Sequence, residues 1–398
     1  MGYNRIMKKV LLRAPLLTNS GYGIHSRQIF SWLYEKEDVD LTVECVQWGR
    51  TSWILDDKQE NGIFKKIMDC SKPIEKGIYD LSFQVQLPDE WDNTLAKKNI
   101  GVTAVVETDK CNPKWVDCCN GMDEIIVPST FTKNVLKRSG LLTKKVIVVP
   151  EWFNEHATNK SLLAKTQLDE RYKKIKKDFN ILVIGTLTSN IPEDDRKNLN
   201  NTIKWLCEEF KDDEDVGIVL KTNFGKGTSS DKEICENYLK SVLLKYRKSN
   251  YPKFNFLHGN MKKEEVAALI DHKNIKVYVS ATRGEGYGLP LIEAAAAGKP
   301  IVATNWSGHL EFLQKENFGT VDYNLVEINK TKVDGRIFLP GFKWADPKAD
   351  SFKKEVRNVY KDYSLAIDKA KKMKKHILFN FNSAVIKKKY DEIFKRVL

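Results

Sequence analysis

The sequence predicts an α/β protein made of two Rossmann-like domains, each a mostly parallel sheet covered by helices. Short apolar runs alternate with helical segments along the chain, which is the pattern of parallel strands joined by crossover helices. In both halves a glycine-containing turn joins an apolar run to a helix, after residues 10–13 and after residues 275–279. The length of 398 residues suits two domains better than one.

The N-terminal half contains six apolar runs that we predict as strands. The first run is followed by residues 18–23, a polar turn with two glycines, and by an amphipathic helix over about residues 24–34. A second helix is expected to start near Thr130, with Ser129 as its N-cap. The predicted strands span residues 10–13, 41–46, 80–85, 100–106, 124–127 and 146–149.

The C-terminal half follows a polar, lysine-rich stretch at about residues 155–177, which we predict to connect the domains. The N-terminal domain is expected over residues 1–160 and the C-terminal domain over residues 161–378. A last amphipathic, lysine-rich helix is expected over about residues 379–398. The predicted strands span residues 179–185, 217–221, 254–257, 275–279 and 301–303, and the predicted helices span 198–210, 230–248, 263–271 and 351–376.

The most informative stretch is RGEGYGLPLIE, residues 283–293, which sets two glutamates eight positions apart across a glycine-rich turn. Pro290 suits the first position of the following helix, and Gly298 is expected to end that helix. A strand, a glycine loop, a helix and a second strand predict a parallel pair with a phosphate-sized opening at the loop. Glu285 would lie in the loop and Glu293 in the first helical turn, so both side chains can face one bound ligand.

This stretch resembles the donor-site signature of the retaining glycosyltransferases of family 4, the glycosyl transferases group 1. Their motif is a glutamate, seven residues and a second glutamate, and the match extends to GYGLP at residues 286–290 and GKPIVAT at residues 298–304. The resemblance implies the GT-B architecture, in which two Rossmann-like domains with parallel sheets face a deep interdomain cleft. It also implies an N-terminal acceptor domain, a C-terminal nucleotide-sugar donor domain and a last helix that packs back on the N-terminal domain.

The resemblance further implies a role for each side chain of the motif and for nearby cations. Glu293 is expected to bind the ribose hydroxyls of the donor, and Glu285 is expected to touch the transferred sugar. The family commonly has a lysine five places after the arginine, but this position is Asn201 here. The diphosphate is therefore expected to contact Arg196 and Lys221, with Lys197 as a weaker candidate. The expected donor-binding residues are Gly21, Tyr22, Gly23, Arg196, Lys197, Lys221, Glu285, Gly286, Tyr287, Gly288, Leu289 and Glu293.

Glu107 stands where many members of the family carry a histidine near the reacting sugar, so a histidine-based step is not expected. We predict that Glu107 faces the acceptor or the sugar, and we keep His25 and His309 as further candidates beside a purely structural role. The expected catalytic residues are Glu107, Arg196, Lys221 and Glu285.

Sugar transfer from a nucleotide sugar requires cations and N–H groups for the departing diphosphate and carboxylates for sugar and ribose hydroxyls. No Asp-x-Asp motif lies in a donor-site context, so we expect no catalytic metal and no cofactor. The donor is expected to be a nucleotide-diphosphate sugar, with a mild preference for a UDP-sugar from the frequencies in the family. Retention is implied by the resemblance, since the leaving diphosphate itself helps to deprotonate the acceptor.

Composition limits the cellular setting and the partners. The net charge of +13 can attract nucleic acid, anionic lipid or anionic small ligands, although lysine is abundant throughout the chain. Seven cysteines without metal-ligand spacing suggest reduced thiols in a cytoplasmic protein. No apolar run is long enough to span a membrane, and residues 1–9 do not resemble a secretory signal.

Several functions stay open at this point. A saccharide or glycoconjugate is the expected acceptor, with modified bases of DNA or RNA as an alternative acceptor because of the basic charge. A non-catalytic protein that binds nucleotide sugars or nucleic acid is a second alternative. Nucleotide-sugar epimerases and glycogen-phosphorylase-like enzymes share the implied architecture. A membrane surface also stays open as a partner of the chain.

Overall fold

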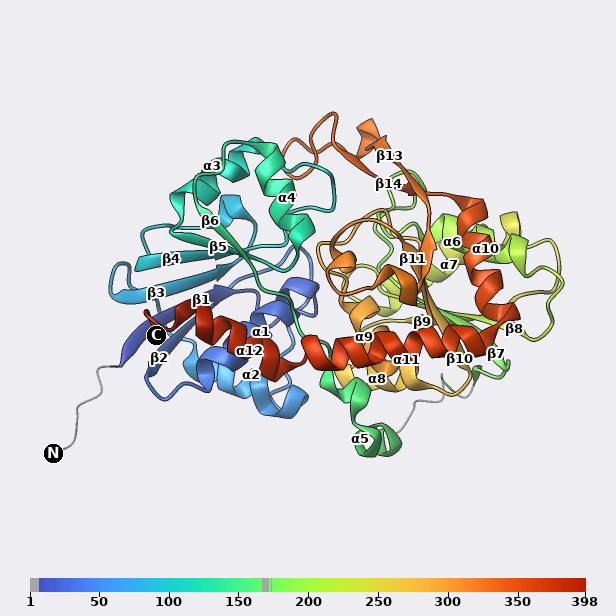
Figure 1. The fold of residues 1–398 in the computed structure, drawn as a ribbon, viewed down its shortest axis with the longest axis horizontal. Coiled ribbons are helices and arrows are strands. Elements are labelled where there is room, and N and C mark those ends of the chain that lie inside the picture. The colour runs from blue at the N-terminus through green and yellow to red at the C-terminus, as the bar shows by residue number, and fades with distance from the viewer. Residues whose placement is uncertain (1–6, 167–171, 173) are drawn as a thin grey trace. The chain divides into compact units, whose positions relative to one another are not determined.

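The computed structural model describes residues 7–166, 172 and 174–398, and the chain divides into two compact α/β units (Figure 1). Unit 1 comprises residues 1–106, 110–152 and 383–398, and unit 2 comprises residues 107–109 and 153–382. Parts of the chain start and of the predicted connecting stretch, residues 1–6, 167–171 and 173, lie outside the described residues. Two Rossmann-like units, each with a parallel six-stranded sheet, confirm the predicted fold class.

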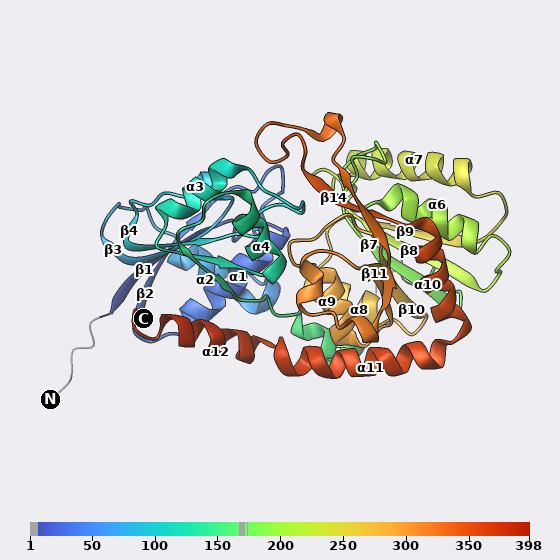
Figure 2. The same ribbon diagram turned by 45° about the horizontal axis from the view of Figure 1, so that its top comes forward.

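Unit 1 has the strand order β2-β1-β3-β4-β5-β6, with every neighbouring pair parallel. Helices α1 and α12 lie on one face of this sheet, and α3 and α4 lie toward the other face (Figure 2). The strands are β1 (Lys8–Ala14), β2 (Val39–Cys45), β3 (Tyr79–Val85), β4 (Ala96–Val102), β5 (Glu124–Val127) and β6 (Lys145–Val148). The helices are α1 (Gly21–Tyr34), α2 (Gln59–Cys70), α3 (Pro113–Gly121), α4 (Thr130–Ser139) and α12 (Ser383–Phe394).

The core of unit 1 draws on both ends of the chain. Trp32 of α1 stacks on Tyr390 of α12 with ring centroids 4.8 Å apart, and Phe394 lies edge-on to Phe83 of β3. The Trp32 indole also donates a 2.8 Å hydrogen bond to Asp391. Burial of these large aromatic rings holds the C-terminal helix in unit 1.

Unit 2 has the strand order β12-β11-β10-β7-β8-β9, also with parallel neighbours. An antiparallel hairpin, β13 (Tyr323–Glu327) with β14 (Lys343–Pro347), accompanies it. The strands are β7 (Phe179–Ile184), β8 (Val216–Thr222), β9 (Lys253–His258), β10 (Ile275–Ser280), β11 (Ile301–Thr304) and β12 (Gly319–Val321). The helices are α5 (Lys160–Lys165), α6 (Leu199–Glu209), α7 (Ser229–Tyr246), α8 (Lys263–Asp271), α9 (Leu289–Ala297), α10 (Ala349–Lys361) and α11 (Tyr363–Asn380).

Several predicted elements have different bounds in the structure, and the last helix, predicted over residues 379–398, spans Ser383–Phe394. The strand predicted to reach residue 106 ends at Val102, and the chain then turns through Val105, which has a φ of 43°. Such a φ is rare for a β-branched residue, so the surrounding contacts hold the backbone in a strained turn. The helix predicted for residues 351–376 is two helices, because Asp362 ends α10 and caps α11 through Leu365 N–H.

Helix α1 begins at Gly21, three residues before its predicted start. Ser20 is its N-cap, and the Ser20 hydroxyl accepts a 3.0 Å hydrogen bond from the Gly23 N–H. Gly21, Tyr22 and Gly23 therefore form the first helical turn instead of a separate loop.

No helix in the described part of the chain is long and apolar enough to cross a bilayer.

Candidate functional site

The glutamate-rich stretch forms the turn from β10 into α9, and β10 pairs in parallel with β11, as predicted. Gly288 precedes the helix in the left-handed region at a φ of 102°, and Gly298 ends the helix at a φ of 82°. The helix starts at Leu289, so Pro290 occupies its second position and not the first. Glu293 consequently lies in the second helical turn, and its predicted place in the first turn was wrong.

A short segment after β11 fixes the conformation of this turn. Ser307 Oγ accepts a 2.9 Å hydrogen bond from the Glu285 N–H, and the Gly308 N–H donates a 2.8 Å bond to the Glu285 carbonyl. A Cβ on Gly308 would lie 2.0 Å from the carbonyl oxygen of Gly286, so only glycine fits there. These contacts hold the Glu285 backbone from both sides.

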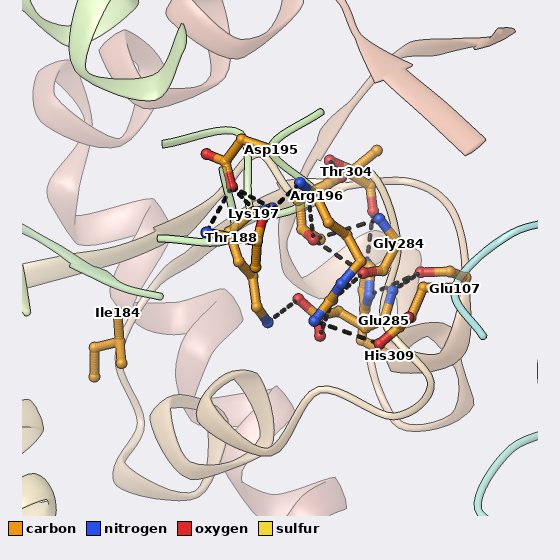
Figure 3. Close-up of polar contacts among 12 residues, drawn as sticks. Glu107, Ile184, Thr188, Asp195, Arg196, Lys197, Gly284, Glu285, Thr304 and His309 are labelled. Carbon is orange, nitrogen blue, oxygen red and sulfur yellow. Dashed lines mark hydrogen bonds and ion pairs between the residues drawn. The ribbon is translucent and has the colours of Figure 1, made fainter. Parts of the chain in front are cut away.

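Four charged side chains meet at this turn (Figure 3). Lys197 Nζ donates a 2.6 Å hydrogen bond to one oxygen of Glu285, and Arg196 Nη1 lies 3.3 Å from the other oxygen. The same Nη1 donates a 2.7 Å bond to the Gly284 carbonyl. Arg196 Nη2 lies 3.4 Å from a carboxylate oxygen of Glu107. The cluster contains two cations and two carboxylates, and it unites three of the predicted catalytic residues with Lys197.

The two cations come from the loop between β7 and α6, which Asp195 organises. Asp195 accepts a hydrogen bond of 2.7 Å from the Leu199 N–H at the start of α6 and one of 2.5 Å from the Thr188 hydroxyl. Thr188 Oγ1 in turn accepts a 3.0 Å bond from the Arg196 N–H. The Arg196 carbonyl accepts a 2.8 Å bond from the Arg283 N–H, so the backbones of the two loops are joined directly.

Glu107 is part of a short segment, residues 107–109, that packs with unit 2. Asp109 donates its N–H to the Lys343 carbonyl at 2.8 Å, and the Lys343 N–H donates to the Asp109 carboxylate at 2.7 Å. A Cβ on Gly284 would lie 2.4 Å from the Glu107 carbonyl oxygen. Gly284 therefore allows the segment with Glu107 to lie directly against the glutamate-rich turn.

The two motif glutamates have opposite electrostatic environments. Burial opposes ionisation of Glu285, but the charges of Lys197 and Arg196 outweigh it and lower the pKa of Glu285 to about 2. Burial raises the pKa of Glu293 to about 7, against a smaller opposing effect of Lys263. The Glu293 carboxylate, in a residue only 9% exposed, has no hydrogen-bond partner in the described part of the chain. After burial itself, both glutamates raise the pKa of Tyr278, so both lie near that ring.

Lys221 lies near the carboxyl end of β8, next to the carboxyl end of β9. Its Nζ donates a 2.8 Å hydrogen bond to the Gly259 carbonyl and a 3.3 Å bond to the Thr222 carbonyl. His258 beside it is only 7% exposed, and its Nε2 has no hydrogen-bond partner among the described residues. Burial, and then the charge of Lys221, lower the pKa of His258. His258 was missed by sequence reasoning, although its place at the carboxyl end of a parallel strand is a usable signal.

The other candidate histidines take part in structural contacts. His309 Nε2 contacts the Thr304 carbonyl at 2.7 Å and its Nδ1 lies 3.5 Å from Ser307 Oγ, while burial lowers its pKa. In the neutral tautomer with its proton on Nε2, His309 donates a hydrogen bond to the Thr304 carbonyl. Its Nδ1 can then accept the Ser307 hydroxyl proton, which stabilises the Glu285 turn. His25 lies in unit 1, where its Nε2 is 3.4 Å from the Tyr390 hydroxyl and burial lowers its pKa to about 4.

The predicted donor-binding residues of unit 1 have clear structural contacts. The Tyr22 hydroxyl accepts a 2.9 Å hydrogen bond from the Ala104 N–H and lies 3.0 Å from the Thr103 hydroxyl. A Cβ on Gly23 would lie 2.2 Å from the Thr18 carbonyl oxygen, whereas a Cβ on Gly21 would meet open space. Gly21 is thus the residue of this turn whose backbone a ligand could approach.

Within unit 2, Tyr287 packs inward and does not present its ring to solvent. It is 3% exposed and lies against Phe312, with ring centroids 5.0 Å apart. Leu289 is also buried. Over the described ranges, no group of three His, Cys, Asp or Glu side chains is arranged to hold a metal ion. The charged cluster of Glu107, Arg196, Lys197 and Glu285 is suited to binding a polar ligand with anionic and hydroxyl groups.

Comparison with known proteins places this turn in a recognised region. Residues 236–377 match the family model described as Glycosyl transferases group 1. That range contains the whole glutamate-rich stretch, from Arg283 to Glu293. No curated protein sequence matches the chain.

Several solved structures share the fold over nearly the whole chain. Sucrose-phosphate synthase from Thermosynechococcus elongatus is 14% identical with a TM-score of 0.63, covering 98% of this chain and 99% of that one. HepE from Anabaena in complex with UDP and glucose is 12% identical with a TM-score of 0.64 and the same coverage. An E. coli structure described as trehalose-6-phosphate bound with UDP-2-fluoro glucose is 10% identical with a TM-score of 0.61, covering 98% and 100%. The chain therefore has the GT-B fold, and its C-terminal part matches the group 1 glycosyl transferases.

Proposed function

We propose that the chain is a metal-independent, retaining glycosyltransferase that moves a hexose from a nucleotide-diphosphate sugar to an acceptor hydroxyl. The observation that carries this proposal is the buried Glu285, held by Arg196 and Lys197 at the turn into α9, with the buried Glu293 eight residues later. The match of this region to the group 1 glycosyl transferases supports it. We place the enzyme in the cytoplasm, with a saccharide or glycoconjugate as acceptor.

The chemistry of the donor matches the groups that surround the turn. Arg196, Lys197 and Lys221 are the cations available for the diphosphate. Glu285 stays ionised at neutral pH, so it can accept two hydroxyl hydrogen bonds from the sugar. Glu293 has unused hydrogen-bonding capacity that two ribose hydroxyls would satisfy. UDP-sugars are the preferred candidates, since HepE binds UDP and glucose on the same fold.

The proposed reaction requires little covalent help from the protein. The bond from the sugar C1 to the diphosphate oxygen breaks, and the acceptor oxygen forms the new bond to C1 on the same face. The acceptor proton passes to the departing diphosphate, so no dedicated protein base is required. Cations near the diphosphate stabilise the negative charge that develops on it, which is where most of the rate enhancement would arise.

The charge balance of the cluster gives Glu107 a specific role. Without a donor, Arg196 is shared between Glu285 and Glu107, and the four charges sum to zero. A diphosphate that binds Arg196 must compete with Glu107, because a carboxylate and a phosphate accept from the same N–H groups. We propose that the donor displaces Glu107 from Arg196 and frees its carboxylate to face the sugar or acceptor.

The test is a product assay with the purified chain. A panel of nucleotide sugars is incubated with saccharide acceptors, with and without a metal chelator, and both nucleotide release and the glycosylated product are measured. We expect transfer that survives the chelator and keeps the anomeric configuration. Consumption of no donor, or an altered nucleotide sugar without an acceptor product, would contradict the proposal.

A matched pair of variants ties the activity to the site. Glu285→Gln should lower kcat/KM by about 100- to 1,000-fold, the usual cost of one group that stabilises charge in a transition state. Glu124→Gln is the control, since Glu124 on β5 of unit 1 also pairs with a lysine, Lys98, at 3.2 Å. Equal activity of the two variants would place the chemistry elsewhere.

A further inference from the structure

Helix α11 has a lysine-rich, solvent-exposed face that the proposed glycosyl transfer does not use. We call this surface the basic face. Its two apolar members stand at opposite ends of the helix, Phe379 with 77% and Leu365 with 53% of the side chain exposed. The basic face consists of Leu365, Asp368, Lys369, Lys371, Lys372, Lys375 and Phe379, all exposed.

The opposite side of α11 explains why the basic face points outward. Ala370, Met373 and Ile377 recur at three- and four-residue spacing, and all three are buried. Lys374 lies at the edge of this buried side, where its Nζ is 3.4 Å from the Ala297 carbonyl at the end of α9. Burial of one apolar stripe anchors the helix, so the basic face needs no partner within the chain for the helix to form.

The charge of the basic face is largely unneutralised. Helix α11 carries five lysines and a single acidic residue, Asp368, which pairs with Lys371 at 3.0 Å. Lys372 and Lys375 have no ion-pair partner among the residues that the structure describes. A shallow hollow of about 490 Å³ opens beside them, lined by Lys371, Lys374, Lys375, Leu378 and Phe379. An exposed aromatic ring therefore lines the same hollow as three lysine side chains, of which Lys375 has no ion-pair partner among the described residues.

Helix α7 shows that this combination is not a general property of the surface. It also exposes large apolar side chains, Leu244 at 82% and Ile234 at 56%. Its three lysines are balanced by three acidic residues, so its net charge is zero. The two helices thus offer similar apolar exposure with very different charge, which makes α7 the natural control.

We propose that the basic face of α11 docks on a bilayer surface that contains anionic lipid. Ammonium groups on one side of a helix are attracted to anionic headgroups, while an exposed phenylalanine can enter the boundary between headgroups and acyl chains. The four lysines of the face supply the charge complementarity, and Phe379 and Leu365 supply the apolar contacts. This docking requires no donor or acceptor, so it stands whether or not the chain transfers sugar.

The test is co-sedimentation of the full chain with vesicles. Vesicles of equal parts phosphatidylglycerol and phosphatidylcholine are compared with vesicles of phosphatidylcholine alone, at low and high salt. We expect binding to the anionic vesicles only, with strong weakening by salt. Lys372→Gln/Lys375→Gln should lose about 25-fold in affinity, since each lysine near an anionic surface contributes about fivefold. Phe379→Ser should weaken binding further when combined with it.

The control variant Lys240→Gln/Lys245→Gln on α7 removes the same charge from another exposed helix and should lose much less. Three results would overturn the proposal. The first is equal binding to neutral and anionic vesicles, and the second is an equal loss in the α7 and α11 variants. The third is that the chain does not bind vesicles but binds a DNA or RNA duplex through α11. That result would assign the basic face to nucleic acid.

Discussion

The same element, a strand followed by a tight turn and a helix, occurs at β1–α1 in unit 1 and at β10–α9 in unit 2, and the two differ in how they are held. The first turn is held through its backbone: the Ser20 cap and the Tyr22 hydroxyl support it, and the buried Arg27 donates 2.9 Å hydrogen bonds to the carbonyls of Leu16 and Thr18. The second turn is held by charges, with Glu285 buried against Arg196 and Lys197.

This difference separates architecture from function. In unit 1 the buried cation, Arg27, donates to loop carbonyls and supports the backbone, whereas in unit 2 Lys197 and Arg196 contact the side-chain carboxylate of Glu285. Taking paired charges out of water costs free energy that their attraction recovers only in good geometry. A further acid, Glu293, is buried with no hydrogen-bond partner among the described residues. Only the unit 2 turn gathers two cations around a carboxylate of the turn itself, which points to a ligand, and function resides in sites placed on a shared fold.

The largest stability effect should come from Gly308→Ala. The new Cβ would lie 2.0 Å from the Gly286 carbonyl oxygen, and backbone on both sides cannot shift without opening the Glu285 turn. We expect a loss of about 5 kcal/mol or more, or failure to fold, measured by urea unfolding. Gly21→Ala is the control in the other turn, because its Cβ meets open space. A Gly308→Ala protein as stable as Gly21→Ala would show that the turn is looser than described.

Lys197→Met should come next, since it leaves Glu285 with only one cation. Removing one member of a mostly buried pair costs about 3 to 4 kcal/mol, because the buried Glu285 then keeps only the longer contact to Arg196. Lys98→Met breaks the pair with Glu124 in unit 1, where both side chains are 20% exposed or more, and should cost at most about 1 kcal/mol. Equal losses would remove the distinction between the two units. Urea midpoints at neutral pH provide the measurement.

Glu293→Gln should make the protein more stable at high pH. The pKa of Glu293 is raised from 4.5 to about 7 in the folded chain, so the unfolded state gives up its proton first. The free energy of unfolding therefore falls as pH rises from about 4.5 to 7, and the cost is complete above 7. Removing the acid should raise the free energy of unfolding by about 3 kcal/mol at pH 8 and change it little at pH 4. A gain that does not depend on pH would exclude ionisation as its cause.

The smallest effect should be that of Tyr22→Phe in unit 1. The substitution keeps the ring, which stacks on Trp48 at 3.9 Å, and removes the hydroxyl contacts to Thr103 and Ala104. We expect a loss of about 1 kcal/mol in stability. Transfer activity is the sharper readout: little change would assign Tyr22 to the architecture of the turn. A loss of donor affinity at unchanged stability would instead support its predicted role in donor binding.

Much of the fold could be predicted because local signals carried it. The apolar runs marked every strand of both sheets except β12, and Gly298 marked the end of α9 because a left-handed residue is required there. The hairpin of β13 and β14 was missed, since residues 328–342 between its strands form a connection far longer than the two to five residues of a common hairpin turn. The start of α1 was missed because glycines disfavour a helix, whereas the Ser20 cap and the Tyr22 contacts outweigh that preference.

The site divides in the same way between local and tertiary information. Glu285, Glu293 and Arg196 were predictable from spacing and resemblance. Asp195, Thr188 and Ser307 were not predicted, because each acts by hydrogen-bonding to backbone that only the folded chain brings near. A lone Asp, Thr or Ser in a loop carries no signal of such a contact. Supporting residues of this kind require coordinates.

The most direct test of the central claim, that the charged turn of unit 2 binds the donor, is calorimetric titration of nucleotide sugars into the wild-type chain and Arg196→Ala. We predict that a UDP-hexose binds the wild type, and that the variant binds it about 10- to 100-fold more weakly, because a charge-assisted contact to the diphosphate is lost. Equal affinities in a variant with an unchanged melting temperature, or no binding of any nucleotide sugar by the wild type, would contradict the account.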